Sequence, residues 1–147
     1  MHDFSNTYGK PPVKVSYNPP AKCSNNWEKA VLPWRAAYKG EQYERIAGVW
    51  LSGVEILSTS TAELTKAGIS WEVNKDITRY STLLNKPQTL VVMLENLVDG
   101  TFTGIYHVNI GFHFFANHDA QFPKYTTPAD LILPISKSSF DNGGHWF

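Results

Sequence analysis

Cysteine, net charge and long apolar runs are what this sequence lacks. Cys23 is the single cysteine among 147 residues, which excludes an intrachain disulfide and a zinc finger built on cysteine pairs. Thirteen basic residues balance thirteen acidic ones, so no basic surplus is available for a phosphate backbone and we expect no nucleic-acid partner. Runs such as 90–94 are too short to span a bilayer, and the first residues lack the apolar stretch of a signal peptide. We therefore expect no membrane contact.

The composition is that of one folded domain, with 42% hydrophobic and 14% aromatic residues. Residues 1–26 carry two proline pairs, which disfavour helix, and we expect them to form an extended arm across the domain surface. The patterned core is expected over 27–115. Residues 116–147 again contain many prolines and glycines and are expected to form a loop-rich segment.

The core alternates with a period of two, which predicts an all-β fold. The clearest alternation places aromatic and aliphatic residues on one face of 106–114 and polar residues on the other. Ser52-Gly53 is a two-residue hairpin signal, and Pro33 suggests that the strand over 29–38 is an edge strand. Asp76 can cap one short helix that ends before Pro87. The pattern predicts an antiparallel sandwich, of the jelly-roll kind, with one short helix.

Two carboxylates stand at strand ends, where a hydrolase could hold a water-activating group. Glu44 precedes the apolar run 46–51, and Glu95 closes the run 90–94. A carboxylate at such a position has limited access to solvent. The alternative interpretation is that each is an ordinary surface glutamate beside a turn, because the sequence does not show that the two strand ends meet.

Metal and sugar chemistry leave different signals. His107 and His113 lie six residues apart on one strand, about 20 Å, so they cannot share a metal ion, and we expect no metal site. The abundant tryptophans, including Trp71, could stack on sugar rings or could simply fill the core. The polar run 58–63 could donate hydroxyl groups to a ligand or could be an ordinary loop.

Several segments together resemble one family, and the set spans residues 17–147. They include the run 40–51 with its motif Tyr43-Glu44-Arg45, and the further segments 17–20, 53–57, 59–63, 68–71, 75–80, 106–109 and 129–134. This ordered set is similar to the N-terminal part of the plant and fungal peptide-N-glycosidase A family, the peptide-N4-(N-acetyl-β-glucosaminyl)asparagine amidases.

The resemblance implies a hydrolase that needs no metal or cofactor. Its expected substrate is an N-linked glycopeptide or glycoprotein, whose Asn–GlcNAc amide is cleaved to leave aspartate. It also implies two jelly rolls with the active site between them, so a second jelly roll would be missing from this chain as its partner, and the chain alone would be weak or inactive. The expected location is the secretory pathway, extracellular or vacuolar.

The resemblance also implies roles for single residues. Glu44 occupies the place of the family's usual aspartate and is expected to activate water, with Glu95 in support. Arg45 is expected to pair with a carboxylate or hold a substrate oxygen. The further substrate-binding candidates are Trp71, Thr59 and Glu63.

Two other functions fit the same sequence. The chain could be a non-catalytic β-sandwich that binds glycans through exposed tryptophans and the polar run 58–63. It could also be a structural remnant whose apolar face is covered by a partner.

Overall fold

The protein is an all-β sandwich in the computed structural model, which describes residues 1–21, 27–63, 65, 67–116, 129, 131 and 132. One sheet has the strand order β1-β8-β3-β6, with β9 also paired to β3, and the other has the order β2-β7-β4-β5. The strands are β1 (His2–Phe4), β2 (Val13–Tyr17), β3 (Lys29–Lys39), β4 (Ile46–Leu51), β5 (Val54–Ser60), β6 (Ile69–Asp76), β7 (Gln88–Leu94), β8 (Ile105–Ile110) and β9 (His113–Phe115).

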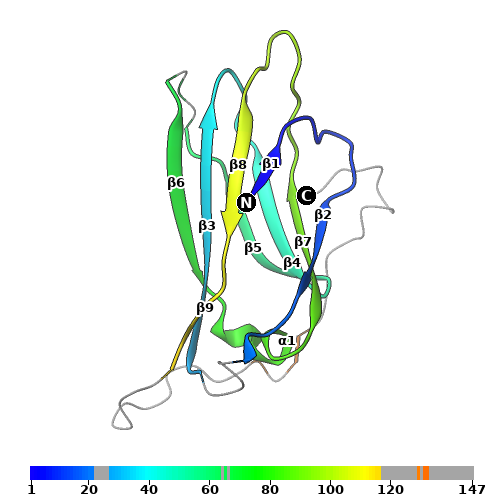
Figure 1. Cartoon of the computed structure of the whole chain (residues 1–147), viewed down its shortest axis with the longest axis vertical. Coiled ribbons are helices and arrows are strands. Elements are labelled where there is room, and N and C mark those ends of the chain that lie inside the picture. The colour runs from blue at the N-terminus through cyan, green and yellow to red at the C-terminus, as the bar shows by residue number, and fades with distance from the viewer. Residues whose placement is uncertain (22–26, 64, 66, 117–128, 130, 133–147) are drawn as a thin grey trace.

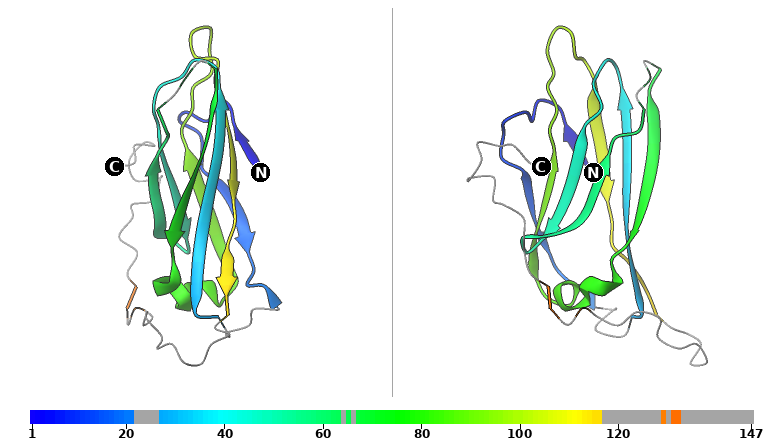
Figure 2. Two further views of the ribbon diagram at one scale, coloured as in Figure 1. Left: turned by 90° about the vertical axis from the view of Figure 1, so that its left-hand side faces the viewer. Right: turned by 180° about the vertical axis from the view of Figure 1, so that it is seen from behind.

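The two sheets face each other and enclose one core (Figures 1 and 2). All the pairings are antiparallel, and from β1 to β8 every connection except the β4–β5 hairpin crosses from one sheet to the other. The expectation of an antiparallel sandwich is therefore confirmed. The buried side chains come from both sheets, with Trp34 and Tyr106 the largest on one side and Leu51 and Leu94 prominent on the other.

Local sequence signals account for much of this architecture. The expected alternation is present in β8, where Tyr106 and Val108 are buried and His107 and Asn109 are exposed. The hairpin signal is confirmed too, because Ser52 and Gly53 both have positive φ, 52° and 80°, as a tight turn between twisted strands requires.

The short helix expected after Asp76 is present as two joined turns. A 3₁₀ turn, η2 (Thr78–Tyr80), runs directly into α1 (Ser81–Leu84). The Asp76 carboxylate accepts hydrogen bonds from the Thr78 backbone N–H at 2.9 Å and from its hydroxyl at 2.6 Å. Although burial alone would raise the pKa of Asp76, these bonds and nearby lysines hold it below its usual value.

The expectation that the Pro33 strand lies at a sheet edge is wrong. β3 is an interior strand, paired with β6 on one side and with β8 and β9 on the other. Proline is tolerated because it lies opposite the break between β8 and β9, where its missing N–H removes no ladder bond and its carbonyl accepts from Gly111 at 3.2 Å.

The N-terminal segment also differs from the expected arm. β1 joins one sheet and β2 joins the other. Phe4 and Tyr17 are buried in the core, although the core was expected to begin only at Trp27. The proline pairs lie outside both strands, so they separate the strands rather than exclude them.

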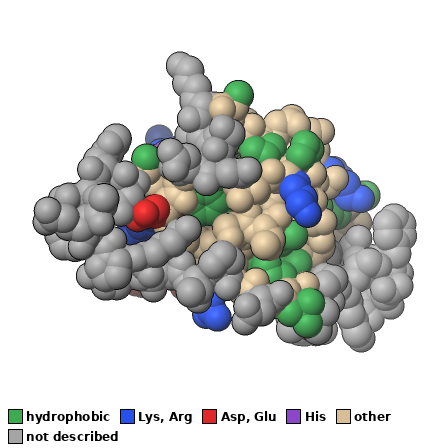
Figure 3. Space-filling model, turned by 90° about the horizontal axis from the view of Figure 1, so that it is seen from below, with side chains coloured by type: hydrophobic (Ala, Val, Ile, Leu, Met, Phe, Trp, Pro, Cys, Tyr) green, Lys and Arg blue, Asp and Glu red, His purple; other side chains and the backbone are tan. Residues whose placement is uncertain are grey.

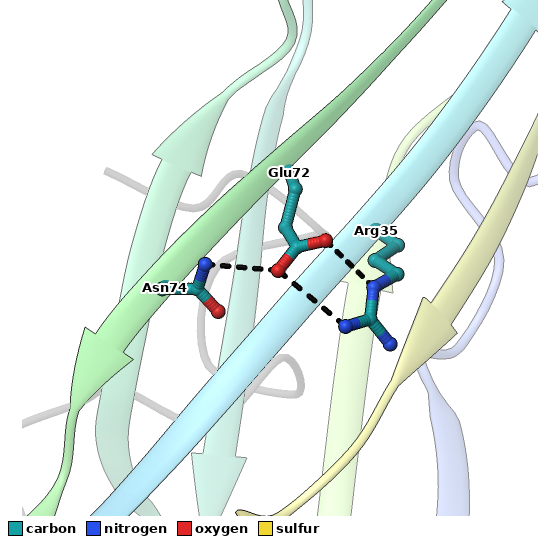
Figure 4. Close-up of polar contacts among 3 residues, drawn as sticks. All are labelled: Arg35, Glu72 and Asn74. Atoms are coloured by element: carbon teal, nitrogen blue, oxygen red, sulfur yellow. Dashed lines mark hydrogen bonds and ion pairs between the residues drawn. The ribbon is translucent and has the colours of Figure 1, made fainter.

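The outer face of β3 and β6 carries a small polar cluster (Figure 4). Arg35 donates to Glu72 from Nε at 2.7 Å, and Asn74 donates to the same carboxylate at 2.8 Å. The bonds from Arg35 and Asn74 hold the pKa of Glu72 below its ordinary value. All three side chains are exposed and satisfied by one another, so the cluster stabilises the pairing of two strands rather than forming a candidate site.

Close packing at Gly104 gives a test of this fold. A Cβ atom there would lie 2.1 Å from the ring of Tyr38, a side chain only 2% exposed. We expect Gly104→Ala to lower the free energy of unfolding by about 2 kcal/mol because the buried ring has to move. Chemical denaturation measures this, with Gly100→Ala as the control, since nothing lies within 4 Å of a Cβ there. Equal stability of the two variants would contradict the packing described.

Candidate functional site

Three connections meet at the upper end of the sandwich in Figure 1, and we call their segments 40–45, 61–63 and 95–104 the upper rim. They meet because β4 begins and β7 ends there, with Ala47 of β4 opposite Leu94 of β7 as the last pair of that ladder. The β5 strand ends at the same place, since the backbone N–H of Thr61 donates to the Arg45 carbonyl at 2.8 Å.

Both carboxylates singled out in the sequence lie on this rim. Glu44 is three residues before Ala47 and Glu95 is one residue after Leu94, so they stand at the same end of two paired strands. Glu44 is exposed and Glu95 is half-buried. Within the described part of the chain, neither carboxylate has a hydrogen bond to another side chain, so both are available to water or to a ligand.

The cation beside Glu44 is held in place. The Arg45 guanidinium donates from Nη2 to the Gln42 side-chain oxygen at 3.0 Å, and the Arg45 backbone N–H donates to the Thr61 hydroxyl at 2.9 Å. The Arg45 Nε is buried and has no hydrogen-bond partner among the described residues. Glu44 and Arg45 are neighbours in the chain, so a carboxylate that can activate water and a cation that can stabilise developing negative charge lie at the same end of the sandwich.

A buried asparagine supports these groups from below. The Asn96 amide, with no exposed surface, donates to the carbonyls of Phe4 and Gly104, both at 2.9 Å. The Asn96 side-chain oxygen accepts a hydrogen bond from the Gln42 side-chain amide at 2.5 Å. The Gln42 amide also donates to the Leu97 carbonyl at 2.7 Å. A continuous chain of bonds therefore runs from Asn96 through Gln42 to Arg45.

Tyr106 fixes the segment that carries Glu44 from the opposite sheet. Its hydroxyl donates to the Tyr43 carbonyl at 2.9 Å. Burial raises the pKa of Tyr106 to about 12, although the Thr61 hydroxyl and the charge of Arg45 act in the opposite direction. The phenol therefore stays protonated, and remains a donor, over the physiological pH range.

The remaining candidates fall in three different places. Glu63 is exposed on the rim, and Thr59 is half-buried in β5 with its hydroxyl donating to the Ser60 carbonyl at 3.2 Å. Trp71 is half-buried and packs on the core, edge-on to Tyr106 with ring centroids 6.5 Å apart. The structure thus brings Glu44, Arg45, Glu95 and Glu63 to one end and directs Trp71 into the sandwich below them.

Gln42, Asn96 and Tyr106 were not predicted from the sequence to be parts of the site. A signal existed for Asn96, because residues 90, 92 and 94 form the inward face of β7 and position 96 continues it. A polar residue in an inward position needs internal partners. No comparable pattern marks Gln42, whose amide donates to Asn96 and Leu97, 54 and 55 residues away in the chain.

Other parts of the surface are less suited to hydrolysis. A groove of about 570 Å³ opens between β1 and β8 on one side and β2 and β7 on the other, and its lining is mainly aliphatic and aromatic. The opposite end of the sandwich, seen in Figure 3, shows hydrophobic side chains in small patches, with Lys or Arg side chains and an acidic patch at its edges, among backbone and uncharged groups. Within the described part of the chain, no three potential metal ligands cluster, and no helix is long and apolar enough to cross a membrane.

Comparison with known proteins gives one consistent result. The family model described as peptide N-acetyl-beta-D-glucosaminyl asparaginase amidase A matches residues 1–147. A relative from Prunus dulcis, named peptide-N4-(N-acetyl-beta-glucosaminyl)asparagine amidase A, is 49% identical over 158 residues, covering 100% of this chain and 28% of the relative. The chain thus spans little more than a quarter of that relative's length. No solved structure matches.

The bonds of Asn96 predict a large effect of removing its amide. We expect Asn96→Ala to lower the free energy of unfolding by about 3 kcal/mol, because the buried carbonyls of Phe4 and Gly104 lose their donor. Chemical denaturation is the measurement. Asn109→Ala, which changes an exposed asparagine of β8, is the control and should stay within about 0.5 kcal/mol of the unaltered chain. A loss below about 1 kcal/mol for Asn96→Ala would contradict the role described.

The raised pKa of Tyr106 predicts a pH dependence of stability. Between pH 10 and about 12 the folded phenol keeps a proton that the unfolded phenol loses, so stability falls as the pH rises through this window. In Tyr106→Phe that part of the decline in stability should be absent. Burial also raises the pKa of Tyr38, so the contribution of Tyr38 to the decline should remain. Denaturation curves recorded across the window test this, and parallel declines for the two proteins would argue against the assignment.

Proposed function

The chain belongs to the peptide N-acetyl-beta-D-glucosaminyl asparaginase amidase A family, and from this membership we propose that it is the part of a glycoamidase that carries the water-activating carboxylate. The reaction is hydrolysis of the amide between an asparagine side chain and the first N-acetylglucosamine of an N-linked glycan. The observation that supports this best is the position of Glu44, exposed on the upper rim beside the fixed guanidinium of Arg45.

The proposed mechanism uses the rim residues directly. Glu44 accepts a proton from a water molecule, whose oxygen attacks the side-chain amide carbonyl of the substrate. The positive charge of Arg45, held in place by its bond to Gln42, stabilises the negative charge that develops on the substrate oxygen. The carbon–nitrogen bond then breaks, the proton passes to the leaving glycosylamine nitrogen, and the peptide keeps aspartate. Glu95, at the neighbouring strand end, supports the site by orienting water.

Substrate binding is proposed to involve the neighbouring rim. Glu63 and Thr59 offer acceptor and hydroxyl groups on the β5 side, and Trp71 forms the apolar floor beneath them. The same residues would serve a non-catalytic module that only binds glycans. The paired strand ends that carry Glu44 and Glu95 favour the hydrolytic function over that alternative.

We also propose that the sandwich is a jelly roll, the first of two in the whole enzyme. The strand order supports it, because each sheet receives strands alternately from both ends of the chain and nearly every connection crosses between the sheets. A second jelly roll docked against the upper rim would complete the site, and the chain alone would then be weak or inactive. Because N-linked glycoproteins occur there, the proposed location is the secretory pathway, extracellular or vacuolar.

Substitution of Glu44 tests the mechanism in a complete enzyme. We would replace the matched segment of the Prunus dulcis relative by this chain and follow release of glycan from an N-linked glycopeptide by mass spectrometry. We expect Glu44→Gln to lower the rate by about 10²–10⁴-fold, because the amide cannot accept the proton. Glu44→Asp, which keeps the carboxylate, should retain part of the activity.

The control is Glu55→Gln, which changes an exposed glutamate of β5 outside the upper rim. Its activity should equal that of the unaltered chimera. Full activity of Glu44→Gln would remove Glu44 from the mechanism.

A further inference from the structure

We propose that the ring of Tyr43, backed by Phe102, is a binding surface for a neutral N-acetylhexosamine ring beside Glu44. The proposal rests on the proposed function only in placing the sugar next to the reacting amide. The binding itself is argued from the exposure, the rigidity and the charge of this part of the rim.

Tyr43 exposes its ring to an unusual degree. The residue is 63% exposed, whereas most aromatic side chains of this chain that the structure describes are buried or half-buried. Phe102 lies against it, with ring centroids 4.7 Å apart and planes inclined by 49°. Because Phe102 is itself half-buried, it supports one side of the tyrosine ring and leaves the rest of that ring open to solvent.

Both rings stand on backbone that is fixed before any ligand arrives. The Tyr43 N–H donates to the Gln42 side-chain oxygen and its carbonyl accepts from Tyr106, each at 2.9 Å. The Phe102 N–H donates to the Asp99 carboxylate at 2.7 Å, and this bond with a second from Thr101 holds the pKa of Asp99 below its usual value. A surface held in this way loses little conformational entropy on binding.

The two loops that carry the rings are also joined directly to each other. The backbone N–H groups of Thr103 and Gly104 both donate to the Glu41 carbonyl at 3.0 Å, and the Thr103 hydroxyl accepts from the Glu41 N–H at 3.3 Å. These bonds connect the segment 40–45 to the segment 99–104. This connection fixes the distance between the tyrosine ring and its phenylalanine support.

The charges around the ring indicate the class of ligand. Glu44 follows Tyr43 directly, so its Cα lies about 3.8 Å from that of Tyr43, and both side chains belong to the same exposed stretch of the rim. The basic residue of the segment, Arg45, is bound to Gln42 and is half-buried. An open aromatic face beside carboxylates repels anions, but suits a ring that offers C–H groups to the aromatic face and hydroxyl donors to the carboxylate. An N-acetylhexosamine has both.

Titration with N,N′-diacetylchitobiose, followed by NMR of the ¹⁵N-labelled 147-residue chain, tests the proposal. We expect the sugar to shift the amide signals of 42–45 and 101–103. Tyr43→Ala should weaken binding by about tenfold, since it removes the stacking surface. Tyr43→Phe, which keeps the ring, should bind as the unaltered chain does. Tyr8→Ala removes another exposed tyrosine ring, 54% exposed, and should have no effect.

Several outcomes would overturn the proposal. One is a lack of any response to the sugar, and another is unchanged binding by Tyr43→Ala whose amide spectrum remains that of a folded chain. A third is that Tyr43→Ala abolishes self-association, measured by sedimentation, while no sugar-dependent shift is seen. The ring would then be a contact between copies of this chain.

Binding and hydrolysis can fail separately, which distinguishes this proposal from the proposed function. Sugar binding that depends on Tyr43, together with full hydrolysis by the Glu44→Gln chimera, would support the binding surface and reject the mechanism. Loss of hydrolysis in Glu44→Gln, with an unchanged KM in the Tyr43→Ala chimera, would support the mechanism and overturn the binding surface.

Discussion

The hydrogen bonds of the buried Asn96 amide are the constraint on which the upper end of the sandwich depends. The amide connects β1, through the Phe4 carbonyl, with the two ends of the β7–β8 connection, where Asn96 and Gly104 lie. It also connects β1 with Gln42 in the β3–β4 connection. Water cannot replace these partners at a site without exposed surface, so the bonds have to form together or not at all. The positions of Tyr43, Glu44 and Arg45 depend on this group through Gln42, and Tyr106 and Thr61 hold the same segment at the Tyr43 carbonyl and the Arg45 N–H.

This arrangement separates support from chemistry. The Asn96 amide and the Tyr106 hydroxyl below the rim are bonded internally, whereas Glu44 and Tyr43 on the upper side are exposed to solvent. A site on rigid strand ends holds its reacting groups more accurately than one on free loops. The family relative is much longer than this chain. Additional protein docked above such a rim would exclude water from the carboxylates, whose positions the rim already fixes.

The sequence predicted those parts of the fold that depend on local pattern. Alternation identified β8, and the Ser52-Gly53 pair identified the hairpin, because each signal lies within a few residues. Pro33 misled because its tolerance depends on the gap between β8 and β9, about 80 residues further along the chain. β1 was missed for a similar reason: three residues carry too little pattern, and only β8 makes them a strand.

The candidate site was predicted in the same uneven way. The positions of Glu44 and Glu95 at strand ends could be inferred from apolar runs, and the pairing of β4 with β7 brings those ends together. Whether a side chain faces inward or outward at a rim depends on its neighbours in space. Trp71 therefore could not be assigned to the core, nor Tyr43 to the surface, without the structure. The Asn96 network depends on partners up to 92 residues away, which no local pattern reveals.

That long separation has a consequence for how the molecule is made. The strand that begins the chain pairs with β8, so the bonds from Asn96 to Phe4 and Gly104 close loops of 92 and 8 residues. Closing the longer loop costs more conformational entropy than closing the shorter one. Proteins dominated by contacts between residues far apart in the sequence fold slowly. During synthesis β1 has no partner until β8 has left the ribosome. The hydrogen bonds of Asn96 at the rim therefore form only after the residues up to Gly104 have been synthesised.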